Sequence, residues 1–205
     1  MRITSIHGPD VPGKFASLIF RHLCSLFQPL LTTYRVRLRG RSHLVLQLMS
    51  SLLRILFQPD PYASTPKSIR PRPRPRCFTG RASQLGPTDA SAYTRLLTTL
   101  CDPSVSAVAT GGHRNQPALT PATDKARKQI GQYLPYLLME YCQCQLYSRL
   151  GLGVKEALLP GLYAIFAVAD KEMLRTLNAS MDTSSRAVFK SLYEDYRRFG
   201  TWDQS

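Results

Sequence analysis

The chain has 205 residues, of which 43% are hydrophobic and 15 are proline, so it can bury the core of one domain while part of it stays outside. Its longest apolar runs are broken by arginine, glutamine or serine well short of a bilayer span, which excludes a transmembrane helix. The formal net charge is +14 and unevenly placed, because residues 1–88 hold 14 Lys and Arg against 2 Asp and Glu, a net of +12. This asymmetry predicts that the N-terminal half meets a polyanion such as RNA or DNA, although a solubilising role would give the same charge.

Two helices are predicted in the N-terminal part of the chain. Apolar residues recur at helical spacing from Lys14 to Thr33, and Pro29 is expected to kink or end that helix because it lacks a backbone donor. A second, strongly apolar helix is predicted from Leu44 to Phe57. Arginine occupies every second position between them, which fits a strand with one basic edge, but the flanking helices favour a basic inter-helix segment.

Residues 58–87 differ in composition from the helices on either side, being rich in proline, arginine and serine. From Arg70 to Arg76 arginine and proline alternate strictly, which forces an extended polyproline-type path and excludes a helix. The region is therefore expected to be a disordered linker. Its arginines could bind phosphates, keep the linker soluble or form a localisation signal, and the sequence leaves these alternatives open.

Helices follow one another closely after the linker. Thr88 and Asp89 are expected to cap the first of them, and after a loop a long helix should start near residue 122 and break at Pro135. The segment from Val154 to Val168 is almost wholly apolar, so it should be the most central helix of this part.

Proline and aspartate are expected to set the bends and starts of the last helices. The pair Pro160-Gly161 is expected to bend its helix into two half-helices. Asp170 and Asp182 are expected to cap the next two helices, and Gly200 should end the last one. That last helix carries an apolar stripe at helical spacing, formed by Val188, Leu192, Tyr196 and Phe199.

These elements predict an all-α fold, a helical array whose consecutive helices are antiparallel neighbours, as at the end of an α-solenoid. Because the densest apolar faces lie in residues 120–205, that fragment is expected to fold on its own. The expected organisation is a flexible N-terminus at 1–13, a basic helical segment at 14–57, a disordered linker at 58–87 and a C-terminal helical domain at 88–205.

No pattern in the sequence predicts catalysis. The five cysteines are odd in number, and Cys142 and Cys144 would diverge by about 200° on a helix, so neither a disulfide framework nor a zinc site is expected. The glycines lack the lysine and hydroxyl residue of a phosphate-binding loop. The start of the chain has no signal-peptide core, so an intracellular, reducing compartment is expected. We therefore expect no enzyme, and no catalytic residue, metal, cofactor, small-molecule substrate or membrane contact.

Two kinds of binding residue are predicted instead. Arginines in the two arginine-rich segments are expected to contact RNA phosphates; they are Arg35, Arg37, Arg39, Arg41, Arg70, Arg72, Arg74 and Arg76. The C-terminal tail combines aromatic and charged side chains on a terminal amphipathic helix, which is typical of a protein-docking patch. The candidate docking residues are Tyr193, Tyr196, Arg197, Arg198, Phe199 and Trp202.

Four stretches also carry a likeness to known sequences: RVRLRGRSHLVLQLMSSLLRILF at 35–57, YLPYLLMEYC at 133–142, VKEALLPGLYAIF at 154–166 and SSRAVFKSLYEDYRRFGTW at 184–202. Together they resemble the C-terminal domain of the nucleolar pre-rRNA processing proteins called Urb-two or Npa-two, and the last stretch is the most specific. The resemblance covers most of residues 35–57 and 89–202 and leaves out the Arg/Pro linker.

This resemblance implies a non-enzymatic helical scaffold in the nucleolus, within the nucleus, that joins early precursors of the large ribosomal subunit. Its implied partners are pre-rRNA or the pre-ribosomal particle and other ribosome assembly factors. Members of the family are much longer, so the chain is expected to be a fragment, a truncated gene model or a shortened paralogue. Two alternatives remain: a generic basic nucleic-acid-binding or regulatory protein acting through its Arg-rich segments, and a helical accessory domain of an enzyme.

Overall fold

A computed structural model of the chain describes residues 13–35, 37–59, 75–78, 84–102, 128 and 130–200. Within these ranges the predicted all-α class is confirmed. The α-helices are α1 (Gly13–Thr33), α2 (Ser42–Leu56), α3 (Pro87–Cys101), α6 (Pro135–Tyr147), α7 (Val154–Val168), α8 (Lys171–Ser180) and α9 (Thr183–Asp195). Shorter elements are the 3-10 turns η1 (Arg39–Arg41) and η2 (Arg76–Phe78), the π-helical turn η5 (Tyr196–Gly200), and an antiparallel pair of two-residue strands, β1 (Gln58–Pro59) and β2 (Ser148–Arg149).

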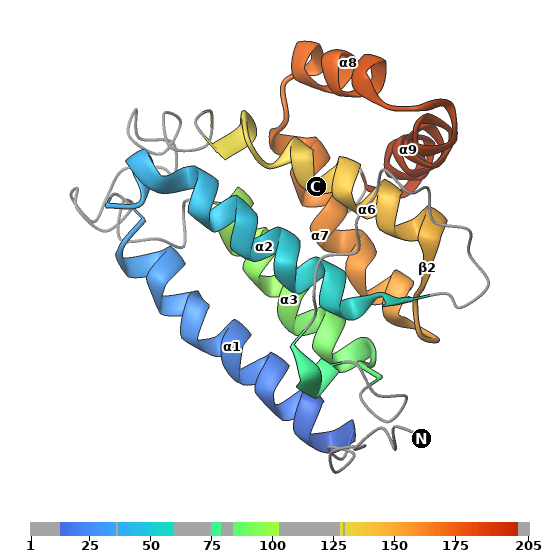
Figure 1. The fold of residues 1–205 in the computed structure, drawn as a ribbon. Coiled ribbons are helices and arrows are strands. Elements are labelled where there is room, and N and C mark those ends of the chain that lie inside the picture. Colours follow the sequence, from blue (N-terminus) through green and yellow to red (C-terminus); the bar gives the residue numbers. More distant parts are fainter. Residues whose placement is uncertain are drawn as a thin grey trace, which may run out of the picture.

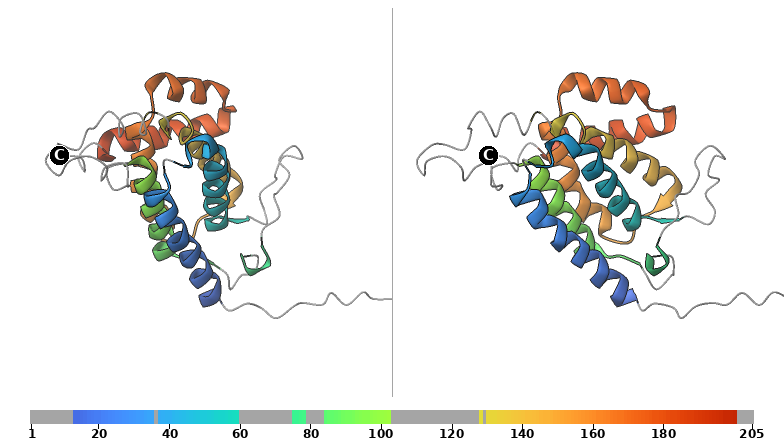
Figure 2. Two further views of the ribbon diagram at one scale, coloured as in Figure 1. Left: turned by 90° about the vertical axis from the view of Figure 1, so that its left-hand side faces the viewer. Right: turned by 60° about the vertical axis from the view of Figure 1, so that its left-hand side comes forward.

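The helices are arranged in two layers, which can be followed in Figures 1 and 2. In the first layer α3 lies between α1 and α7 and packs against both. In the second layer α2 packs against α3 and α6, and α6 also contacts α7. The C-terminal helices α8 and α9 pack on α6, at the end of the array that is coloured orange to red.

The helices of the first layer run in the same direction. Early in α1, the Ser17 hydroxyl donates a hydrogen bond to Asp89 Oδ1 at the start of α3, at 2.6 Å. Near the end of α1, Gln28 Nε2 donates to Thr99 Oγ1 close to the end of α3, at 2.8 Å. Because the start of α1 contacts the start of α3 and the end of α1 contacts the end of α3, the two helices are parallel.

The same order holds between α3 and α7. Gly153, just before α7, lies beside Pro87 at the start of α3. Gly161, in the middle of α7, lies beside Leu97 in the second half of α3. A Cβ atom at Gly161 would lie only 3.0 Å from Leu97 Cδ1, so the glycine allows the two helices to approach closely. Parallel stacking of α1, α3 and α7 beside a second layer that contains α2 and α6 resembles the arrangement of an α-solenoid.

Both layers share one continuous core. Phe20 of α1, Leu53 of α2, Leu97 of α3, Leu137 of α6 and Leu162 of α7 are all fully buried in the same cluster. Burial of each such side chain contributes roughly 1.5–3 kcal/mol to stability. The shared core therefore joins the expected N-terminal segment, which ends at residue 57, to the expected C-terminal domain, which begins at residue 88.

Part of the expected linker belongs to this core. The buried ring of Phe78 meets Phe20 edge to face, with centroids 6.5 Å apart, and Leu85 is also buried. The strand β1 pairs with β2. Residues 58–59, 75–78 and 84–87 of the expected linker are therefore part of the fold, because Phe78 and Leu85 gain stability by burying apolar surface.

Prolines inside the helices do not end them. The helix α1 continues past Pro29, and α7 is one continuous helix through Pro160, so the prediction of two half-helices is wrong. Pro160 is exposed, and the Thr94 hydroxyl donates to the carbonyl of Ala157 in the preceding turn at 2.7 Å. Pro160 removes the backbone bond to the Glu156 carbonyl. The Thr94 hydroxyl bonds the next carbonyl and so holds the same turn of α7 against α3.

The predicted helix starts are partly confirmed. Pro135 begins α6, and Asp182 caps α9 by accepting from two backbone N–H groups, both at 3.1 Å. Asp170 occupies the N-cap position of α8 without a side-chain cap bond. The cap of α3 is Gly86 rather than Thr88, and the Gly86 N–H donates to Asp89 at 2.9 Å.

Candidate RNA-binding and protein-docking surfaces

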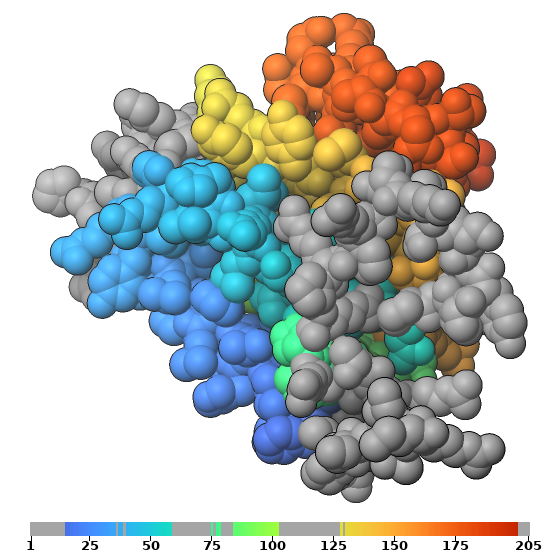
Figure 3. Space-filling view, viewed as in Figure 1, coloured from blue at the N-terminus to red at the C-terminus, as the bar shows by residue number. Residues whose placement is uncertain are grey.

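The first candidate surface is the corner between α1 and α2, light blue at the left of Figure 3. As predicted, the alternating arginines form an inter-helix segment rather than a strand. Arg37 and Arg41 are exposed, and the Arg37 guanidinium carbon lies 5.8 Å from the centroid of the Tyr34 ring. A guanidinium over an aromatic face is held by a cation–π attraction while its edge stays free for other ligands.

Arg35 does not belong to this surface. It is only 6% exposed, and its guanidinium donates to the carbonyl oxygens of Thr99, at 3.0 Å, and Leu100. These carbonyls lie in the last turn of α3, where the helix itself supplies no donors. Burial lowers the pKa of this guanidinium, in keeping with a structural role. The prediction that Arg35 contacts phosphate is therefore wrong, because the side chain caps α3.

The remaining candidate arginines are less defined. Arg39 and Arg76 lie on the 3-10 turns η1 and η2, where the backbone path is described. Arg70, Arg72 and Arg74 lie outside the described residues. Their contact with RNA stays a prediction.

The second candidate surface is the end of α9 with η5. Tyr193 and Tyr196 are half-buried, and their rings pack on Phe166 of α7 at centroid distances of 5.4 and 5.2 Å. Tyr196 also meets Tyr163 at 5.7 Å. These contacts hold the end of α9 against α7, so the rings of the two tyrosines stabilise the packing of these helices.

The side chains beyond this aromatic cluster point outward. Arg197 and Arg198 are exposed, and the Phe199 ring is 64% exposed. Gly200 is buried, and a Cβ atom there would collide with the Tyr196 ring. Only glycine therefore fits at the end of this wide helical turn. Trp202 lies outside the described residues.

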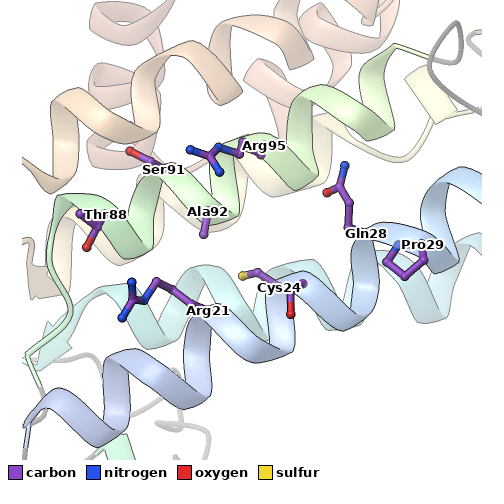
Figure 4. A pocket seen from close by; sticks show the side chains of 9 residues that line it. Arg21, Cys24, Gln28, Pro29, Thr88, Ser91, Ala92 and Arg95 are labelled. Carbon is purple, nitrogen blue, oxygen red and sulfur yellow. The ribbon is translucent and has the colours of Figure 1, made fainter.

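A third surface was not predicted from the sequence. An open groove of about 800 Å³ lies between α1 and α3, and Figure 4 shows side chains from both helices around it. Cys24, Pro29 and Ala92 give it apolar walls. Its polar lining residues are Arg21, Ser25, Gln28, Thr88, Ser91 and Arg95. Arg21 and Arg95 are 74 positions apart, and neither belongs to an arginine-rich segment, so no local pattern in the sequence pairs them.

The cysteines are free thiols in varied surroundings. Burial raises the pKa of both Cys24 and Cys142 to about 12, so these thiols are neutral near pH 7. Cys144 lies 3.8 Å from Glu140, whose carboxylate forms an ion pair with Arg54 of α2. Among the described residues, no three His, Cys, Asp or Glu side chains are placed to hold a metal ion.

None of the helices in the described ranges has the length and apolar character needed to cross a membrane.

An array of stacked helix pairs, with exposed arginines and an exposed aromatic end on separate surfaces, is typical of helical scaffold proteins that bind other macromolecules.

The chain belongs to the Urb2/Npa2 family, whose sequence model matches residues 3–205. The match includes the Arg/Pro-rich region that the resemblance left out. The chain is similar to the Probable nucleolar pre-ribosomal-associated protein 2 of Schizosaccharomyces pombe, with 22% identity over 200 residues. This similarity covers 95% of the chain and 14% of the relative's length. No solved structure matches the chain.

Proposed function

We propose that this chain is a non-catalytic scaffold module that takes part in processing large-subunit pre-rRNA within early pre-60S particles of the nucleolus. The observation that carries the proposal is the family match over residues 3–205, together with a relative named as nucleolar and pre-ribosomal-associated. A stacked helical array suits this task, because it presents long surfaces to several partners at once.

The RNA-facing part of the module is the α1–α2 corner. Arg37 and Arg41 are exposed there, on a chain whose formal charge is +14. Arginine binds phosphate through a planar fork of donors, and such contacts do not depend on the base. Arg39 and the arginines of the Arg/Pro tract, from Arg70 to Arg76, remain candidate phosphate contacts by their sequence alone.

The protein-facing part is the outer side of η5. Arg198 and Phe199 are exposed on a turn whose other side is fixed by the tyrosines packed on Phe166. An exposed Phe ring beside arginine, on a rigid support, combines two residue types that are enriched in protein interfaces. With Arg197, these residues form the docking patch for other assembly factors, and Trp202 is a further candidate by its sequence.

The test is affinity purification of the tagged 205-residue chain from its source cells, with RNA and proteins identified together. Recovery of large-subunit rRNA precursors with assembly factors is the expected result. Recovery of neither would reject the proposal. Recovery of mixed RNA without assembly factors, lost when Arg70, Arg72, Arg74 and Arg76 are replaced by serine, would instead establish the generic nucleic-acid-binding alternative.

Matched variants separate the two surfaces. Arg37→Ser with Arg41→Ser should reduce the recovered RNA, and Phe199→Ala should reduce the recovered proteins. The control is Lys155→Ser with Lys190→Ser, which removes the same charge from exposed positions on α7 and α9. Equal losses in the control would mean that overall charge, rather than the corner, governs the RNA recovery.

A further inference from the structure

Among the described residues that line the groove between α1 and α3, two side chains are positively charged and none is acidic. Arg21 comes from α1 and Arg95 from α3, on either side of the groove in Figure 4. The thiol of Cys24 in its wall is neutral, because burial raises its pKa to about 12. The groove therefore presents a net positive surface to any ligand that enters it.

A buried carboxylate holds one of these arginines in place. Asp89 is buried behind Arg21 and already accepts hydrogen bonds from the Ser17 hydroxyl and the Gly86 N–H. Arg21 Nε lies 3.5 Å from the same carboxylate, and its side chain remains 51% exposed. The ion pair orients the guanidinium at the groove without removing it from solvent, so Arg21 can bind a second anion.

The other arginine is unengaged. Arg95 is exposed, and within the described part of the chain its guanidinium has no hydrogen-bond or ion-pair partner. Thr88 adds a hydroxyl group to the wall, whereas Ser25 and Ser91 already donate their hydroxyl protons to the carbonyls of His22 and Pro87. The two guanidinium groups are therefore the main donors of the groove, and arginine is a common donor to phosphate oxygens in nucleic-acid complexes.

We propose that the α1–α3 groove binds the phosphate backbone of single-stranded RNA through Arg21 and Arg95. The assignment of RNA as the ligand rests on the proposed function above, whereas the positive charge of the groove is a property of the fold. Base identity should matter little, because the side chains that line the groove are suited to phosphates rather than to base edges.

The test uses the full 205-residue chain and a fluorescent oligouridylate, whose binding is followed by anisotropy at several salt concentrations. Arg21→Ser with Arg95→Ser should weaken binding about 100-fold, since each charge-assisted contact contributes about tenfold. The slope of log K against log salt should fall by about 1.4, at about 0.7 for each lost phosphate contact to a single strand. The charge-matched control, Lys155→Ser with Lys190→Ser, should change affinity less than about threefold.

The double variant could lose stability, because it breaks the ion pair between Arg21 and the buried Asp89. A second variant therefore tests binding with that ion pair intact. Arg95→Ser alone leaves that pair intact and should still weaken binding about tenfold, with an unchanged thermal melting curve. If the single and double variants bind oligouridylate like the control pair, the proposal is overturned. Groove-dependent binding of a polyglutamate peptide in place of RNA would also overturn it, since the groove would then serve an acidic protein segment.

Failure of the groove and failure of the proposed function give different results. If the double variant still recovers pre-ribosomal RNA from cells and still binds oligouridylate normally, the groove is not the RNA site and the proposed function stands. If the unaltered chain recovers no pre-ribosomal RNA but loses oligouridylate binding on substitution, the groove binds RNA and the proposed function fails.

Discussion

Two arginines of the same basic segment, Arg35 and Arg37, have opposite surroundings. Arg35 is buried and donates to two carbonyl groups at the end of α3, whereas Arg37 is exposed. Arg35→Ala should lower the free energy of unfolding by about 2–4 kcal/mol, because it leaves two buried carbonyls without a donor. Arg37→Ala should change it by less than about 0.5 kcal/mol. Urea denaturation followed by circular dichroism measures both, and equal losses would contradict the capping role.

At this scale, the sequence predicts local contacts and misses distant ones. The cap at Asp182 was predictable because its donors, Ser184 and Ser185, follow within three residues. Arg35 was misassigned because its partners lie 64 and 65 positions away, and an alternating pattern does not show which arginine turns inward. The groove residue Arg95 was also missed, because Arg21, on the other side of the groove, lies 74 positions away in the sequence.

Along α9 and η5, the apolar stripe has a buried part and an exposed part. Leu192 is buried, while Phe199 is 64% exposed. Leu192→Ala should cost about 2–5 kcal/mol of stability, since it removes a packed side chain and leaves a cavity. Phe199→Ala should cost less than about 1 kcal/mol and instead reduce the recovery of partner proteins. Thermal unfolding of the two variants separates the roles, and a large loss for Phe199→Ala would place that ring in the core.

Periodicity predicted the helices themselves well, because a buried face repeats every three to four residues and can be read locally. The positions of α2, α7 and α9 follow from that pattern. Pro160 was overinterpreted, because a sequence does not show that a proline ring faces solvent or that Thr94 of another helix donates to the neighbouring carbonyl. Phe78 and Leu85 were hidden in a stretch whose composition is dominated by proline and arginine.

For the whole molecule, the packing of α7 on α3 leads us to predict that residues 120–205 do not fold on their own. Leu158 and Leu162 of α7 are fully buried, and α7 packs along α3, which that fragment lacks. The fragment should therefore show no cooperative unfolding transition, because its main apolar face would be exposed to water. A fragment of residues 84–205, which retains α3, is the control and should keep more helical signal. Melting of the 120–205 fragment as sharply as the whole chain would contradict this.

Parallel stacking also gives the array a polarity. Translation from α1 to α3 to α7 leaves two unlike ends, whereas a two-fold arrangement would make them equivalent. At one end, the outer side of α1 exposes Phe15, Leu18, Leu26 and Leu30, while at the other η5 lies against α7. The two ends of the stack therefore present different surfaces to water, one a row of exposed apolar side chains and the other a helix partly covered by η5.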